Sequence, residues 1–124
     1  MTAQSSTLVV DDNPDLREAV ALFLRYAGKR VFEAADGREA LESLEAEPGI
    51  GLIVLDLMMP VMDGLTFLDR KARGRHAAIP VVIFSSCSAR SVNGYRCPIS
   101  VVSKTEGLDA LLAAVHTLEG AAHA

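Results

Sequence analysis

Short apolar runs alternate with longer amphipathic segments along this 124-residue chain, and this alternation limits its fold more than any other feature. The apolar runs are each short enough to be one strand, and they lie at residues 6–10, 29–34, 51–57, 79–86 and 99–103. Apolar residues recur at helical spacing from 14 to 27, from 37 to 47, from 65 to 74 and from 108 onwards. Strands this apolar need cover on both faces, so the pattern predicts an α/β fold with a doubly wound parallel sheet.

Length and composition predict a single domain over residues 1–124, with flexible tails at 1–5 and 120–124. The net charge of −4 argues against non-specific nucleic-acid binding, so we expect no direct nucleic-acid partner. No apolar run approaches the roughly 18 residues that a bilayer span requires. The first residues, MTAQSST, also lack the basic and apolar regions of a signal peptide. We therefore expect a cytoplasmic protein without a membrane partner.

Five polar side chains fall at the carboxyl ends of predicted strands: Asp11, Asp12, Asp56, Ser85 and Lys104. Right-handed crossovers bring these strand ends to one edge of a parallel sheet, where ligands bind in such folds. Three crowded carboxylates need a cation, and an all-oxygen set with few protein ligands suits Mg²⁺. A neighbouring lysine adds a positive charge that can hold an anionic group. The sequence therefore predicts a magnesium site beside an anion site.

Taken singly, most of these residues have a purely structural explanation. Asp11 alone is typical of a helix N-cap or a turn, Ser85 of a strand end, and Lys104 of a solvated surface. Asp56 is harder to explain in this way, because it ends the apolar run LIVLD and burying an unpaired carboxylate is costly. Together, the five residues favour a functional site.

Four motifs in this order resemble those of the response-regulator receiver domain: VVDDN at 9–13, LIVLDLMMPVMDG at 52–64, VVIFSS at 81–86 and VVSKT at 101–105. The spacing of 44 residues from Asp12 to Asp56 also fits that family. The resemblance covers essentially the whole chain. It implies a flavodoxin-like (βα)5 fold whose five-stranded parallel sheet has the order 2-1-3-4-5, with helices on both faces.

The resemblance also implies roles for the acidic residues. Asp56 would be the phosphoacceptor, which takes a phosphoryl group from a sensor histidine kinase or a histidine phosphotransferase. Asp12 and Asp56 would bind Mg²⁺ directly, together with the backbone carbonyl of Met58. Asp11 would reach the metal through water.

The remaining motif residues would act around the acceptor. Lys104 would pair with Asp56 at rest and with a phosphoryl oxygen afterwards, whereas Ser85 would donate its hydroxyl to the phosphoryl group. Pro60 and Gly64 would shape the acceptor loop. These roles agree with phosphoryl-transfer chemistry, which depends mainly on positioning and on neutralising charge.

Three features depart from the family. Thr105 follows Lys104 where most receivers have a cis proline, so we expect a trans bond, because a non-proline cis bond costs about 3 kcal/mol. Val101 stands where many receivers carry Tyr or Phe, so the aromatic rotamer switch is absent. Only 18 residues separate Ser85 from Lys104, and the stretch 86–98 lacks helical periodicity. The fourth helix of the family pattern is therefore expected to be short or irregular.

Two positions that tune phosphate loss in the family hold Met58 and Cys87 here, where many receivers have polar residues. Our hypothesis is that these apolar side chains screen the acyl phosphate from the attacking water.

The sequence thus predicts a stand-alone, chemotaxis-regulator-like receiver, a monomer or weak homodimer that acts on an unknown downstream protein. It would catalyse only its own phosphoryl acceptance and slow hydrolysis, and would otherwise not be an enzyme. One alternative is a pseudo-receiver that binds partners without phosphate. A phosphohydrolase is disfavoured, because Met58 occupies the position of the general acid in that class.

Overall fold

The structure, a computed structural model, describes residues 5–86 and 94–122. Its strands are β1 (Ser6–Val10), β2 (Arg30–Ala34), β3 (Ile50–Leu55), β4 (Val81–Ser85) and β5 (Ile99–Ser103). The helical elements of the described residues are α1 (Pro14–Tyr26), α2 (Gly37–Ala46), α3 (Gly64–Ala72), the 3₁₀ turn η1 (Lys104–Glu106) and α4 (Leu108–Ala122).

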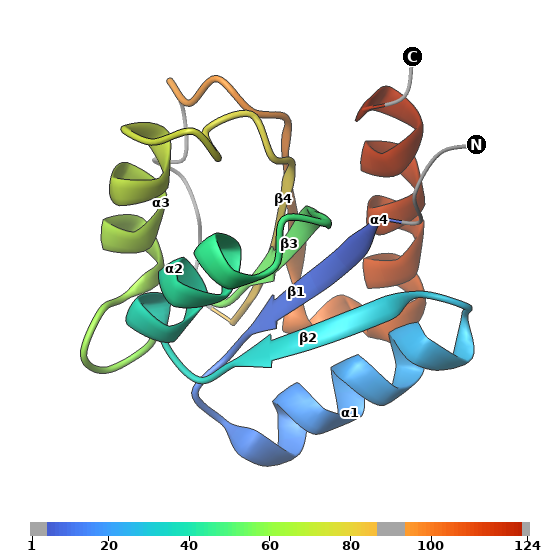
Figure 1. Cartoon of the computed structure of the whole chain (residues 1–124). Coiled ribbons are helices and arrows are strands. Elements are labelled where there is room, and N and C mark those ends of the chain that lie inside the picture. Colours follow the sequence, from blue (N-terminus) through green and yellow to red (C-terminus); the bar gives the residue numbers. More distant parts are fainter. Residues whose placement is uncertain (1–4, 87–93, 123–124) are drawn as a thin grey trace.

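The five strands form one parallel sheet in the order β2-β1-β3-β4-β5, which confirms the predicted fold. Helices α2 and α3 cover one face of this sheet, and α1 and α4 cover the other (Figure 1). Each face has its own buried apolar core. The three-layer arrangement explains why the strands are apolar along their whole length rather than on alternate residues.

Strand β1 illustrates how one sequence run serves both cores. Leu8 and Val10 point into the core beneath α2 and α3, whereas Val9, between them, points into the core beneath α1 and α4. All three side chains are at most 1% exposed. The strand therefore cannot slip by one residue without exchanging its two sets of side chains, which fixes the position of the residues that follow it.

The helices begin where side-chain caps end the preceding loops. Asn13 caps α1 by accepting hydrogen bonds from two backbone N–H groups, and Pro14 occupies the first turn, as predicted. Asp36 and Asp63 cap α2 and α3, each by accepting one hydrogen bond from a backbone N–H group. Gly28, just after α1, has a φ of 91°, a conformation that glycine adopts without strain. Local chemistry thus sets these boundaries.

Several predicted boundaries differ from the structure. The predicted strand at 79–86 is shortened to Val81–Ser85, and Pro80 immediately before it has no N–H to donate to the ladder. The strand expected at 51–57 is Ile50–Leu55, so Asp56 and the next residue lie in the loop. Helix α4 runs to Ala122, into the tail predicted at 120–124.

Other predictions fall outside the described residues. These are residues 1–4 and 123–124 of the predicted tails and residues 87–93, which make up most of the expected short fourth helix. Within the described part of the chain, no helix is both long and apolar enough to cross a membrane.

Candidate functional site

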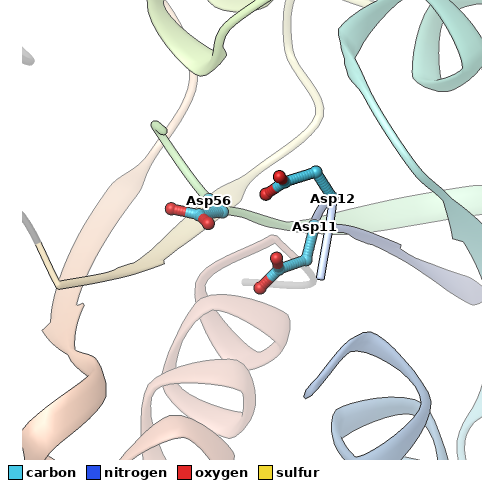
Figure 2. Close-up of side chains that lie close together, drawn as sticks. All are labelled: Asp11, Asp12 and Asp56. Atoms are coloured by element: carbon cyan, nitrogen blue, oxygen red, sulfur yellow. The ribbon is translucent and has the colours of Figure 1, made fainter. Parts of the chain in front are cut away.

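Three aspartates meet at the carboxyl ends of β1 and β3 (Figure 2). One carboxylate oxygen each from Asp11, Asp12 and Asp56 lies within 4.8 Å of the other two. Asp11 and Asp56 are buried, whereas Asp12 is exposed. The cluster therefore has a closed inner side and an open outer side, through which an ion or a reacting group can enter.

Asp56 is the first residue after β3, and its backbone N–H still donates to Val10 O at 3.0 Å. Although Asp56 is buried, each of its two carboxylate oxygens has a polar partner. Oδ1 accepts hydrogen bonds from Ser85 Oγ at 2.8 Å and from the Met58 N–H at 3.2 Å. Oδ2 accepts one from Lys104 Nζ at 3.1 Å. These contacts offset the cost of burying the carboxylate.

Lys104 bridges two of the three carboxylates, with Nζ 3.1 Å from both Asp11 Oδ2 and Asp56 Oδ2. Burial lowers the pKa of Lys104, but its hydrogen bonds to the two aspartates outweigh burial and raise that pKa above the usual value. Burial also raises the pKa of Asp11, although the Asn13 N–H and Lys104 oppose this shift. With all groups ionised, three carboxylates face one ammonium, so two negative charges remain in excess.

The 3₁₀ turn η1 holds Lys104 in place. The Ser103 side chain accepts a hydrogen bond from the Thr105 N–H at 3.3 Å, and Glu106 Oε2 accepts one from the Ser103 N–H at 2.7 Å. This reciprocal capping box fixes the loop without a proline. The bond between Lys104 and Thr105 is trans, as predicted, since the described residues contain no cis peptide.

Two glycines allow backbone segments to approach the acceptor loop closely. A Cβ at Gly64 would lie 2.7 Å from the carbonyl oxygen of Asp56, and one at Gly37 would lie 2.8 Å from Met62 Cγ. The Gly37 N–H donates to Met62 O at 3.0 Å, so the start of α2 holds the loop between β3 and α3. Sequence reasoning identified Gly64 but treated Gly37 only as a helix start, because the contact joins segments far apart in the chain.

Every predicted metal-binding or catalytic residue that the structure describes belongs to the acidic cluster or contacts it. Met58 contacts Asp56 through its backbone N–H, and its side chain is 64% exposed. Its carbonyl as a metal ligand, and its side chain as a screen against water, stay predictions. Cys87 lies outside the described residues. Sequence reasoning missed Arg17, whose Nη1 donates to Asp11 O at 3.0 Å.

The family model for the response regulator receiver domain matches residues 7–116. The chain is 38% identical over 85 residues to the probable transcriptional regulatory protein TcrX of Mycobacterium tuberculosis, with 68% of this chain and 35% of that protein covered. It is 40% identical over 80 residues to the two-component response regulator ORR5 of Oryza sativa subsp. japonica, with 64% and 60% covered. The chain spans about a third of the length of the bacterial regulators it matches.

Solved structures of response regulator proteins are similar to this chain over nearly its whole length. A response regulator receiver protein from Pseudomonas putida has a TM-score of 0.83 at 28% identity, with 94% of this chain and 99% of that chain covered. The response regulator protein TrrA from Thermotoga maritima, solved in complex with Mg²⁺-BeF, has a TM-score of 0.81 at 26% identity, with 93% and 99% covered.

Proposed function

Because the chain belongs to the response regulator receiver family, we propose that it accepts a phosphoryl group on Asp56 in a Mg²⁺-dependent reaction. The donor is the phosphohistidine of a sensor histidine kinase or a histidine phosphotransferase. One observation carries the proposal above the others. The Asp56 carboxylate is buried beside two further carboxylates. Its oxygens accept hydrogen bonds from the Ser85 hydroxyl and the Lys104 ammonium group.

The residues present fit a magnesium ion. Three carboxylates supply oxygen donors within 4.8 Å of one another, and their two excess negative charges match a divalent cation. Asp12 and Asp56 would bind Mg²⁺ directly with the carbonyl of Met58, and Asp11 would bind it through water. Bound there, the ion would neutralise negative charge on the acceptor carboxylate and on the incoming phosphoryl group.

In the transfer, an Asp56 carboxylate oxygen attacks the phosphorus atom and forms the new P–O bond as the P–N bond of the phosphohistidine breaks. The electron pair of that bond stays with the imidazole. Ser85 and Lys104 lie 2.8 Å and 3.1 Å from the Asp56 oxygens, so a small shift brings both donors onto the phosphoryl oxygens. Their hydrogen bonds stabilise the charge that the carboxylate gains with the new group.

The change of partners at Ser85 and Lys104 is also the proposed output signal. Ser85 ends β4 and Lys104 begins η1, so the end of β4 and the start of η1 shift when the two donors move from the carboxylate to the phosphoryl group. Val101 on β5 is 50% exposed and supplies no aromatic switch. We therefore assign the coupling to the end of β4 and to η1, and to a downstream protein that recognises their shift. The protein itself turns over no separate substrate.

Intact-mass measurement after incubation with acetyl phosphate and Mg²⁺ tests this function. The wild type gains one phosphoryl group and Asp56→Asn gains none, because the acceptor oxygen is lost. Asp15→Asn, which changes an exposed aspartate near the site, gains one like the wild type and serves as the matched control. A wild type that stays unlabelled, while a control receiver is labelled, refutes the proposal and favours the pseudo-receiver.

A further inference from the structure

The guanidinium of Arg17 connects β2 to the loop that carries the acidic pair. Its Nη1 donates to the carbonyl oxygen of Asp11 at 3.0 Å, and its Nε donates to Glu33 Oε1 at 3.2 Å. The Arg17 side chain is 20% exposed, so these two guanidinium donors, which we call the fork, are largely shielded from water. A planar guanidinium anchored at Glu33 can hold the loop in one position.

The hydrogen bond from Arg17 to the Asp11 carbonyl affects the position of the Asp12 side chain more than that of Asp11. The buried Asp11 carboxylate accepts hydrogen bonds from the Asn13 N–H at 3.0 Å and lies 3.1 Å from Lys104 Nζ. The Asp12 carboxylate is exposed, and no residue that the structure describes donates a hydrogen bond to it. Its position therefore depends on its own backbone.

The peptide bond between Asp11 and Asp12 is planar, so a hydrogen bond that fixes the Asp11 carbonyl also fixes the N–H of Asp12. We propose that Arg17 is a positioning residue, which orients this peptide and thereby places the Asp12 carboxylate for Mg²⁺ binding. This inference rests on the proposed function, because it takes the three aspartates to be a Mg²⁺ site. In this proposal Arg17 is neither a metal ligand nor a donor to the phosphoryl group.

Arg25 offers a matched control. It also contacts Glu33, with Nη2 3.6 Å from Oε2, but its hydrogen bond goes to Val31 O rather than to the acidic loop. Replacing either arginine with methionine removes one positive charge and keeps an apolar stem of similar length. Only the Arg17 variant loses the donor to the Asp11 carbonyl.

Charge and positioning have opposite effects on Mg²⁺ affinity in these variants. Removing a positive charge near a cation site favours cation binding, since a repulsive Coulomb interaction is lost. Losing the orientation of a ligand disfavours it, typically by about 10- to 100-fold for groups that support metal ligands. A weaker affinity in Arg17→Met therefore cannot arise from the lost charge.

The experiment measures Mg²⁺ dissociation constants by isothermal titration calorimetry on the unphosphorylated protein. We expect Arg17→Met to bind Mg²⁺ about tenfold more weakly than the wild type. Arg25→Met should bind it equally well or more tightly. Arg17→Lys keeps the repulsive charge but loses the two-donor guanidinium, so it should bind Mg²⁺ at least as weakly as Arg17→Met. In acetyl phosphate labelling, the half-saturating Mg²⁺ concentration should rise in Arg17→Met while the rate at saturating Mg²⁺ stays unchanged.

An Arg17→Met variant that binds Mg²⁺ as tightly as the wild type overturns the inference and leaves the proposed function intact. A wild type that binds no Mg²⁺ overturns both. If circular dichroism shows that Arg17→Met does not fold, Arg17→Lys provides the test. A Mg²⁺ affinity of Arg17→Lys equal to that of the wild type then overturns the positioning role of Arg17. Equal weakening in Arg25→Met also overturns it, because that variant leaves the acidic loop untouched.

Discussion

The acceptor loop contains a strained turn, and this predicts that Val61→Gly stabilises the fold. Val61 has a φ of 63°, and the Met62 N–H donates to Pro60 O at 2.7 Å, which closes a three-residue γ-turn around Val61. Such a turn with a positive central φ is rare and strained, most of all for a β-branched residue. The hydrogen bond from the Gly37 N–H to Met62 O holds the turn in this conformation.

The size of the effect follows from two opposing contributions. A non-glycine residue in the left-handed region costs about 1–2 kcal/mol, which the substitution removes. Glycine gains freedom in the unfolded chain, which costs about 0.4–1 kcal/mol. The Val61 side chain is 79% exposed, so its loss removes little buried apolar surface. We therefore expect the free energy of unfolding to rise by about 0.8 kcal/mol.

Urea denaturation measures this change as a higher midpoint at an unchanged slope. Val61→Ala is the matched control, because it removes the branched side chain but keeps the Cβ atom that causes the strain. It should gain less than half as much stability as Val61→Gly. A lower midpoint in Val61→Gly, or an equal gain in Val61→Ala, would refute the reasoning from backbone strain.

Three further predictions concern packing and pH. Gly37→Ala should lower the free energy of unfolding by about 1–3 kcal/mol, because the new Cβ would lie 2.8 Å from Met62 Cγ. Leu111→Ala should lower it by about 2–5 kcal/mol, since this side chain is 0% exposed. Burial, followed by the hydrogen bond to Asp69, raises the pKa of Tyr95 from 10.0 to about 12. The stability that protonated Tyr95 contributes is therefore present below pH 10.0 and is lost as the pH rises towards about 12. Tyrosinate absorbance measures the pKa of Tyr95 directly.

Matched variants separate these causes. Gly49→Ala places its Cβ 3.9 Å from the nearest atom and should leave stability nearly unchanged, so an equal loss there would argue against the clash at Gly37. Leu22→Ala changes a side chain that is 61% exposed and should cost far less than Leu111→Ala. Tyr26→Phe leaves a single tyrosine in the absorbance titration. An ordinary pKa there would contradict the assignment for Tyr95.

Much of the fold could be predicted because its strands are buried on both faces. A run such as LIVL, ahead of Asp56, has few stable environments other than a covered parallel sheet. Once the strands are parallel, the residues at their carboxyl ends must gather at one edge. That topology brings Asp56, Ser85 and Lys104 together, although they are spread over 49 residues of the chain.

The remaining features depend on side-chain geometry that no local pattern records. Arg17 reads in the sequence as an ordinary charged residue of helix α1. Its contacts with Glu33 and the Asp11 carbonyl depend on how α1 packs beside β2. The contact between Gly37 and Met62 likewise joins two loops that are distant in sequence. Pro60 and Gly64 were expected to shape the acceptor loop, but no sequence pattern indicated that Val61 would adopt a positive φ.

A crystal structure of the chain with Mg²⁺ and fluoroberyllate, a phosphoryl mimic, would test the central claim most directly. The account predicts beryllium bonded to a carboxylate oxygen of Asp56, with Mg²⁺ bound by Asp12 beside it. It also predicts that the Ser85 hydroxyl and the Lys104 ammonium donate to the fluorine atoms. Fluoroberyllate on another carboxylate, or a pocket that stays empty at saturating concentrations of both reagents, would contradict the assignment of Asp56 as the phosphoacceptor.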